Sequence, residues 1–225
     1  MATSKKRGIK SSAQDNFLQP DPVTGLTGTD VGTNRSFGDG AVDLSWSLPA
    51  TSPAATSYTI TTTPATTTIV TNSSNTTHRV TGLTAGSYTF TVVGTNAAGT
   101  ANPTTSSSIA VTTVPNAPTG VSASATSANV NTISWTAPAN GGKAISSYTI
   151  TGSDGTSYTG ISASATSYAA TDNTPSSTSP GSQTYTVVAL NANGTSAGAT
   201  TASITTTKGV RGLTPHKYRE RANSR

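Results

Sequence analysis

The stretch TFTVVGTNAAGT, residues Thr89–Thr100, decides the fold, because the chain repeats it as TYTVVALNANGT at Thr184–Thr195. The two copies are identical at eight of twelve positions and lie 95 residues apart. In the first copy Tyr88, Phe90, Val92 and Gly94 alternate with threonines, and only Val93, like Val188 in the second copy, breaks the polar face. A period of two predicts a half-buried β-strand, since alternate side chains of a strand point to one face.

Other landmarks recur in the same order along the chain. Thr24 corresponds to Thr119 and Ile109 to Ile204, again at a spacing of 95 residues. The two tryptophans, Trp46 and Trp135, are only 89 apart, because the first copy carries six extra residues around Thr33–Gly40. The chain is therefore an internal duplication, and about seven short alternating segments per copy predict two antiparallel β-sandwiches.

The repeats define four regions of the chain. We expect a basic N-terminal arm at residues 1–20, a first sandwich at 21–113, a second sandwich at 114–207 and a basic C-terminal arm at 208–225. The junction Val114–Pro118 is short and contains two prolines, which favours a semi-rigid connection.

Composition agrees with an all-β fold and narrows the possible chemistry. Charged residues make up 9% of the chain, and threonine, serine, alanine and glycine take their place. Such a chain favours strands over helices. The absence of cysteine rules out disulfides and thiolate metal sites.

The net charge of +5 is concentrated at the two ends. The N-terminal arm has four basic residues against one aspartate, the C-terminal arm has six against one glutamate, and the region between has three against six aspartates. Basic runs of this kind are usually solvated tails, and that alternative stays open, but we expect the arms to dock on other subunits through charge complementarity. The candidate docking residues are Lys5, Lys6, Arg7, Lys10, Lys208, Arg211, Lys217, Tyr218, Arg219, Arg221 and Arg225.

A family resemblance rests on the order of these motifs. A proline-containing start, the second-strand tryptophan, a Tyr-x-Ile strand and the run from Leu83 to Gly99 resemble a fibronectin type III module. The resemblance covers roughly Pro22–Thr113 and Pro115–Thr207. It implies Greek-key sandwiches with a core that contains Trp46, Tyr88, Phe90, Trp135 and Tyr185. It also implies a bond from the Tyr88 hydroxyl to the backbone at the strand corner, whereas Gln183 takes that position in the second copy.

No residue pattern indicates catalysis. His78 is the only histidine between the arms and precedes a strand valine, which favours a surface strand position. Asp39 and Asp43 lie in a turn leading into a strand and are too few for a calcium site. We therefore expect no enzyme activity, no catalytic residues, no metal and no cofactor. Four tripeptides fit the N-glycosylation pattern, and they begin at Asn34, Asn72, Asn75 and Asn193.

The function expected from the sequence is a non-enzymatic structural virion protein of a tailed bacteriophage. Such domains resemble modules of phage heads and tails, so the chain would be a capsid decoration or tail accessory protein, present in several copies in a symmetric assembly. Its partners would be other virion proteins, with weak contacts to host glycans. No apolar run has the length of a membrane span, and the basic start lacks the apolar core of a secretory signal. Assembly in the host cytoplasm is therefore expected.

Three alternatives remain. The modules could be spacers of a cell-surface adhesin or a carbohydrate-handling protein, which predicts a secretion signal or anchor. The basic arms could bind nucleic acid, although Tyr218 is the only Phe, Tyr or Trp of the C-terminal arm that could stack on a base. A disordered mucin-like segment is the third, and the strand register in both copies argues against it.

Overall fold

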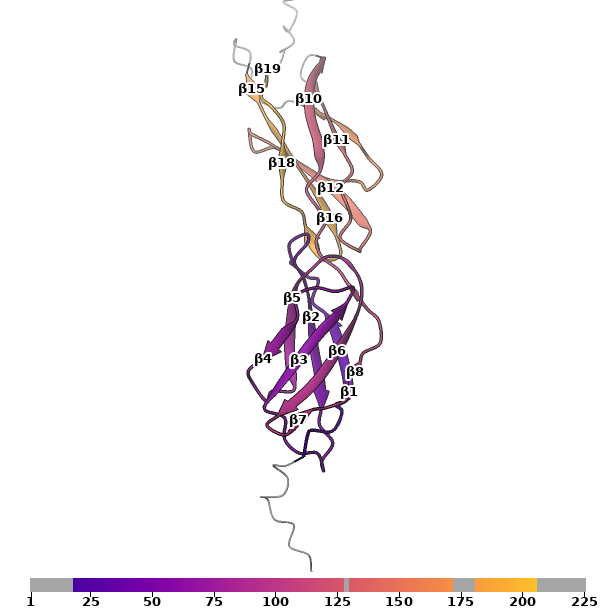
Figure 1. Ribbon diagram of the computed structural model, residues 1–225. Coiled ribbons are helices and arrows are strands. Elements are labelled where there is room, and N and C mark those ends of the chain that lie inside the picture. The colour runs from indigo at the N-terminus through magenta and orange to yellow at the C-terminus, as the bar shows by residue number, and fades with distance from the viewer. Residues whose placement is uncertain (1–17, 128–129, 172–180, 206–225) are drawn as a thin grey trace, which may run out of the picture. The chain divides into compact units, whose positions relative to one another are not determined.

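The computed structural model describes residues 18–127, 130–171 and 181–205, and throughout these ranges the chain forms strands, turns and bends without a helix (Figure 1). The strand pairs whose register the structure describes are all antiparallel. The predicted all-β fold is therefore confirmed. Threonine-rich alternation and the scarcity of good helix formers are the physical reasons.

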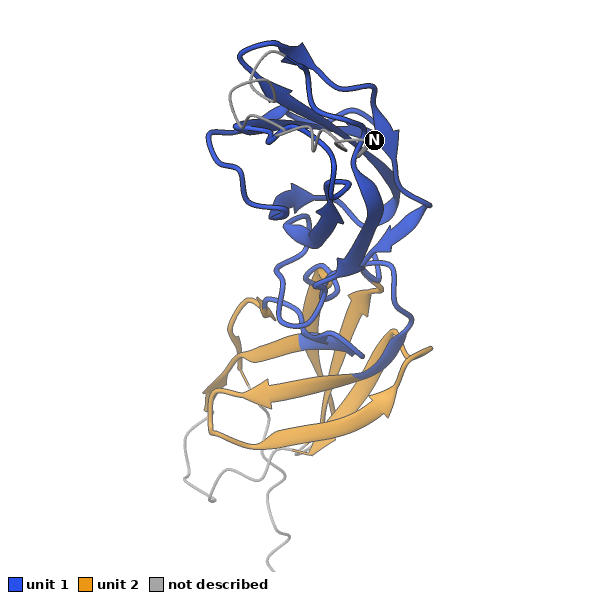
Figure 2. Ribbon diagram, turned by 90° about the horizontal axis from the view of Figure 1, so that it is seen from below, with its two compact units in different colours: residues 1–117, 138–147, 188–197 blue, residues 118–137, 148–187, 198–225 orange. Residues whose placement is uncertain are grey.

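The chain divides into two compact units, coloured separately in Figure 2. Unit 1 comprises residues 1–117, 138–147 and 188–197, and unit 2 comprises residues 118–137, 148–187 and 198–225. Unit 1 thus contains the whole first repeat together with two segments of the second. The limit between residues 113 and 114, taken from the repeat, stays a prediction.

The first repeat forms two antiparallel sheets. The smaller has the order β1-β2-β5, and its strands are β1 (Thr24–Asp30), β2 (Gly40–Ser47) and β5 (Thr77–Leu83). The larger has the order β4-β3-β6-β7, with β8 and β9 also paired to β6. Its strands are β3 (Ser57–Thr63), β4 (Ile69–Thr71), β6 (Gly86–Asn96), β7 (Gly99–Thr100), β8 (Thr104–Thr105) and β9 (Ile109–Val111).

The described part of the second repeat has three sheets. One has the order β10-β11-β14, another β13-β12-β16-β17 with β18 paired to β16, and the third joins β15 to β19. The strands are β10 (Thr119–Ser127), β11 (Val130–Thr136), β12 (Ile145–Gly152), β13 (Ser157–Ser162), β14 (Ser167–Thr171), β15 (Ser182–Gln183), β16 (Tyr185–Asn191), β17 (Gly194–Thr195), β18 (Ala199–Thr200) and β19 (Ile204–Thr205).

The period of two in β6 places its apolar residues in the core. Tyr88, Phe90, Val92 and Gly94 are buried, and the two threonines and Val93 between them are half-buried. Strand β3 lies beside β6, with Ile60 opposite Val92 (Figure 1). The core cluster joins both sheets of the first repeat. Its large members with no exposed surface are Tyr58, Ile60, Leu83 and Phe90.

A hydroxyl-bearing side chain holds β6 and β16 at matching positions. The backbone N–H of Phe90 donates to Oγ of Ser106 at 3.0 Å, and that of Tyr185 donates to Oγ1 of Thr201 at 3.0 Å. The backbone N–H groups of Ser106 and Thr201 donate back to the carbonyls of Phe90 and Tyr185. The duplication in sequence is therefore also a duplication in hydrogen bonding, although serine replaces threonine.

Each repeat contains a buried tryptophan beside a buried tyrosine. The ring centroids are 5.0 Å apart for Trp46 and Tyr58 and 5.1 Å apart for Trp135 and Tyr148. The indole Nε1 and phenolic hydroxyl of both pairs are buried without a hydrogen-bond partner among the described residues. A buried hydroxyl without a partner is destabilising, because it has lost its bonds to water.

We therefore expect Tyr58→Phe and Tyr148→Phe to leave stability unchanged or to raise it by up to about 1 kcal/mol. Tyr185→Phe is the matched control, because its hydroxyl accepts a hydrogen bond from Nδ2 of Asn131 at 2.7 Å, and it should cost about 1–2 kcal/mol. Urea denaturation measures all three. A loss above about 1 kcal/mol in Tyr58→Phe would show that its hydroxyl has a stabilising partner.

Candidate recognition site

The side chains predicted from the sequence fall into two groups. Those expected in the core are buried, with Trp46 and Trp135 each 4% exposed, Tyr88 6%, Phe90 0% and Tyr185 1%. Those expected to dock lie outside the described residues. They are Lys5, Lys6, Arg7, Lys10, Lys208, Arg211, Lys217, Tyr218, Arg219, Arg221 and Arg225.

The Tyr88 hydroxyl does not take the partner that the resemblance implied. It bonds to Oγ1 of Thr84 at 3.0 Å, so a side chain four residues upstream replaces the expected backbone group. Thr84 lies between β5 and β6, which places its hydroxyl within reach of the ring. At the matching position of the second repeat, Gln183 is 4% exposed and pairs with Ile204 across β15 and β19.

Both arginines of the first repeat are paired with an aspartate. The Arg79 guanidinium donates to both carboxylate oxygens of Asp43, at 2.6 and 2.7 Å. These bonds hold the pKa of the Asp43 carboxyl below its usual value. Asp39 is paired with Arg35 at 2.9 Å. No cluster of three or more metal-ligating side chains occurs in residues 18–127, 130–171 and 181–205.

Two of the glycosylation tripeptides lie in contrasting environments. Asn193 is 8% exposed, and its Nδ2 donates to Oγ1 of Thr112 at 2.8 Å and to the carbonyl of Thr113 at 3.1 Å. The folded structure therefore does not offer this nitrogen for modification. Asn34 is exposed, with a φ of 57°.

The extra residues of the first copy form a loop between β1 and β2 that is held from within. Nε of Arg35 donates to the carbonyl of Asp39 at 2.7 Å, while Nη2 reaches its carboxylate at 2.9 Å. The Asp39 backbone N–H donates to the carbonyl of Ser36 at 2.9 Å. Oδ1 of Asp39 accepts from the N–H of Gly82, which ties the loop to β5. Phe37 lies between these anchors and is 42% exposed.

Backbone hydrogen bonds also fix this loop to other parts of unit 1. The N–H of Asn34 donates to the carbonyl of Asn193 at 2.8 Å, and the N–H of Val114 donates to the carbonyl of Arg35 at 3.0 Å. A Cβ on Gly194, whose φ is 134°, would lie 3.0 Å from Oδ1 of Asn34. Glycine permits this close approach because it has no side chain.

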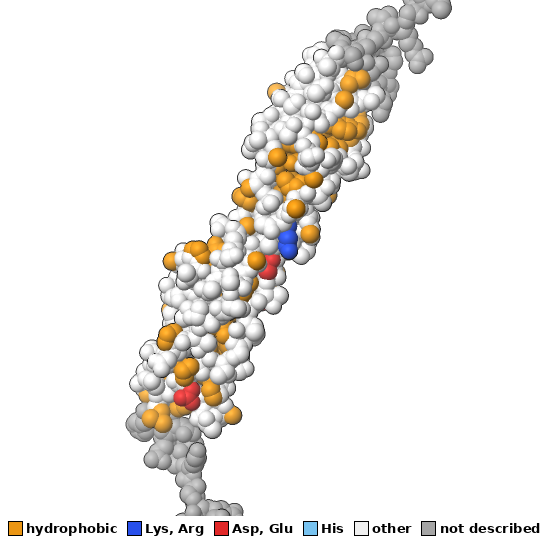
Figure 3. All heavy atoms as spheres, turned by 90° about the vertical axis from the view of Figure 1, so that its right-hand side faces the viewer, with side chains coloured by type: hydrophobic (Ala, Val, Ile, Leu, Met, Phe, Trp, Pro, Cys, Tyr) orange, Lys and Arg blue, Asp and Glu red, His pale blue; other side chains and the backbone are white. Residues whose placement is uncertain are grey.

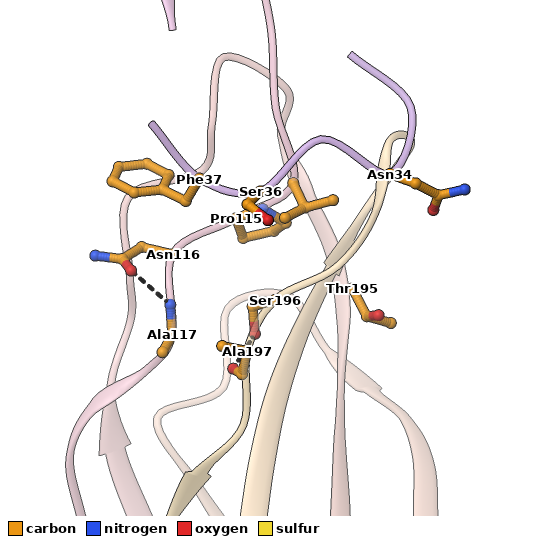
Figure 4. Close-up of a pocket in the computed structure, with 10 residues that line it drawn as sticks. Asn34, Ser36, Phe37, Pro115, Asn116, Ala117, Thr195, Ser196 and Ala197 are labelled. Carbon is orange, nitrogen blue, oxygen red and sulfur yellow. Dashed lines mark hydrogen bonds between the residues drawn. The ribbon is translucent and has the colours of Figure 1, made fainter. Parts of the chain in front are cut away.

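A pocket of about 410 Å³ lies beside the loop (Figure 4). Its walls come from three stretches of unit 1: residues 34, 36 and 37 of the loop, residues 114–117, and residues 195–197 after β16. In Figure 4, Phe37 and Asn116 extend to one side of the pocket and Asn34 and Thr195 to the other, with Ser36 and Pro115 between them. The lining contains no charged side chain.

This pocket was not predicted from the sequence. The loop was visible there only as a difference in length between the repeats, and Phe37 was not singled out. The sequence did contain a signal for the ordered loop, because Arg35 and Asp39 are four residues apart with Phe37 between them. The contributions of Asn116 and Thr195 depend on tertiary contacts.

The surface agrees with the low charge of the sequence. On the face drawn in Figure 3, Lys, Arg, Asp and Glu side chains are sparse among the described residues, and apolar side chains are scattered between polar groups. No helix in the described part of the chain is long and apolar enough to span a membrane.

Comparisons with known proteins bear on the fold. No curated protein matches the sequence. The FN1-FN3 domains of chicken CNTN1 are 20% identical, with 85% of this chain and 68% of that chain covered and a TM-score of 0.49. A two-domain fibronectin type III segment of chicken tenascin is also 20% identical, with 84% and 100% covered and a TM-score of 0.39. Residues 21–110, which include β1–β8 of the first repeat, match the family model of the fibronectin type III domain.

Proposed function

We propose that this chain is a non-enzymatic adhesion or spacer protein. The observation that carries the proposal is the match of residues 21–110 to the fibronectin type III domain, on a chain whose second half repeats the first. The ion pair between Asp43 of β2 and Arg79 of β5 also supports a structural role, because the two side chains neutralise each other's charge. The matching family model, the fibronectin type III domain, is not that of an enzyme.

The more specific form of the proposal is a structural virion protein of a tailed bacteriophage. Its support is the charge distribution of the sequence, with a basic arm on either side of a slightly acidic region. The arms would anchor the chain to acidic surfaces of other virion subunits, and the sandwiches would decorate or space the assembly. Such anchoring is electrostatic and should weaken as salt concentration rises.

The test begins with particles purified from the source culture by density gradient. We expect quantitative mass spectrometry to find the chain in these particles in a fixed copy number. Amide hydrogen exchange should then show residues 1–20 and 208–225 protected in the particle and unprotected in the free protein. Absence of the chain from the particles would refute the virion role while leaving the adhesion or spacer role standing.

A charge variant separates anchoring by the arms from anchoring by the sandwiches. Replacing the lysines and arginines of both arms with glutamine should prevent incorporation into particles. The matched control replaces Lys143, the one lysine between the arms, with glutamine, and should incorporate normally. Normal incorporation of the arm variant would move the anchor to the sandwich faces.

A further inference from the structure

We propose that the pocket beside Phe37 binds a neutral saccharide unit. This inference deepens the adhesion role proposed above and rests on it, because it names what the adhesive surface would recognise. The argument uses three properties of the pocket: an exposed aromatic ring, unpaired polar side chains and the absence of charge.

The aromatic ring is exposed by a loop that is already rigidly held. Three large apolar side chains are exposed among the described residues, and Phe37 is the aromatic one. The paired Arg35 and Asp39 close the loop beneath it, and the Asp39 carboxylate also binds the Gly82 N–H. A ring held this way loses little conformational freedom when a ligand stacks on it. The C–H face of a pyranose is an apolar surface of suitable shape for such stacking.

The polar groups around the ring can still form hydrogen bonds. Oδ1 of Asn116 accepts from the N–H of Ala117 at 2.8 Å, which orients the amide and leaves Nδ2 available to donate. On the side of Phe37, the hydroxyl of Ser36 also has no hydrogen-bond partner among the described residues, while Asn34 and Thr195 lie at the opposite side of the pocket (Figure 4). Amides and hydroxyls both donate and accept, so they match the vicinal hydroxyls of a sugar.

The absence of charge selects the class of saccharide. None of the residues that line the pocket is ionisable, and the nearby Arg35 guanidinium is already bound to Asp39. A phosphate or a carboxylated sugar would lose its bound water in the pocket, and no unpaired cationic side chain in the lining would compensate for that loss. The volume of about 410 Å³ lies within the usual range of about 300–1,000 Å³ for small-molecule sites. A neutral sugar therefore satisfies the site better than an anionic ligand.

The test is an NMR titration of the full-length, ¹⁵N-labelled protein with four neutral sugars, maltotriose, triacetylchitotriose, mannotriose and lactose, each up to about 50 mM. We expect at least one sugar to give saturable shifts at Ser36, Phe37, Asn116 and Thr195, with a dissociation constant of about 1–10 mM. The absence of saturable shifts with all four sugars would overturn the proposal. Saturable shifts that lie only elsewhere in the chain would overturn it too.

Variants identify the ring and the amide as the recognising groups. Phe37→Ala and Asn116→Ala should each weaken binding by about tenfold or more, while Phe37→Tyr keeps the stacking surface and should bind nearly as well as the parent. Val70→Ala is the matched control, because Val70 is an exposed apolar residue on β4 outside the pocket. Equal binding by Phe37→Ala and the parent would overturn the proposal.

The outcome is distinguishable from that of the particle experiment. Sugar binding depends on Phe37 and is measured on the isolated protein, whereas incorporation depends on the arms and is measured on particles. Phe37→Ala should therefore incorporate normally, and the arm variant should bind the sugar normally.

Discussion

Gly141→Ala should destabilise unit 1 by about 3 kcal/mol or more. A Cβ at this position would lie 2.4 Å from the carbonyl oxygen of Val114 and 2.5 Å from that of Thr113. Both neighbours are backbone atoms in a buried stretch, so they cannot turn away as a flexible side chain could. The φ of 67° adds a conformational cost for any residue with a side chain.

Gly160→Ala provides the matched control. Gly160 has a φ of 68°, almost the same as that of Gly141, but a Cβ there would meet nothing within 4 Å. It should therefore show the conformational cost alone, about 1–2 kcal/mol. The difference between the two variants measures the steric part of the effect.

Native-state hydrogen exchange should locate the damage of Gly141→Ala within unit 1, where the first repeat ends. Residue 141 belongs to the second repeat in sequence but to unit 1 in the structure, where its carbonyl accepts from the N–H of Thr113 at 2.8 Å. Protection should fall around residues 111–116. A loss confined to residues 118–205 would contradict the contact between these stretches.

Phe90→Ala should cost about 3–5 kcal/mol, the range found when a buried phenylalanine is truncated. Phe90 has no exposed surface, and its ring centroid lies 6.4 Å from that of Tyr88. The variant leaves a cavity between two sheets whose strands are tied by hydrogen bonds and cannot collapse to fill it. Thermal unfolding of the first repeat should shift downward by more than about 10 °C.

Val70→Ala serves again as the control, because Val70 is 58% exposed and should change stability by less than about 0.5 kcal/mol. Calorimetry with the two variants and the parent gives the comparison. Equal melting of Phe90→Ala and the parent would contradict the assignment of β6 as the centre of the core.

The sequence alone determined the strands and their faces. Alternation in Thr89–Thr100 and in its second copy is a local property, and a period of two places Phe90 and Val92 of β6 on one buried face, as it does Tyr185 and Val187 of β16. Val93, Val188 and Leu190 are the apolar residues left on the opposite, half-buried face. The Asn-x-x-Gly sequence at the end of each stretch likewise predicts a turn from local residues alone. In the structure, Oδ1 of Asn96 accepts a hydrogen bond from the N–H of Gly99 at 3.2 Å within that turn. Because the pattern occurs twice, the duplication could be recognised without a structure.

The tertiary structure decided which distant residues meet. Nδ2 of Asn191 donates a hydrogen bond to the carbonyl of Thr113 at 3.0 Å, although the two residues are 78 positions apart in the sequence. The local sequence around either residue does not predict this bond. The pocket beside Phe37 arises in the same way, from three stretches brought together in unit 1. Periodicity is a property of a few neighbouring residues in the sequence. The contacts named here depend instead on how closely two distant stretches of backbone approach each other. Glycines such as Gly141, which have no side chain, and the packing around them determine that distance.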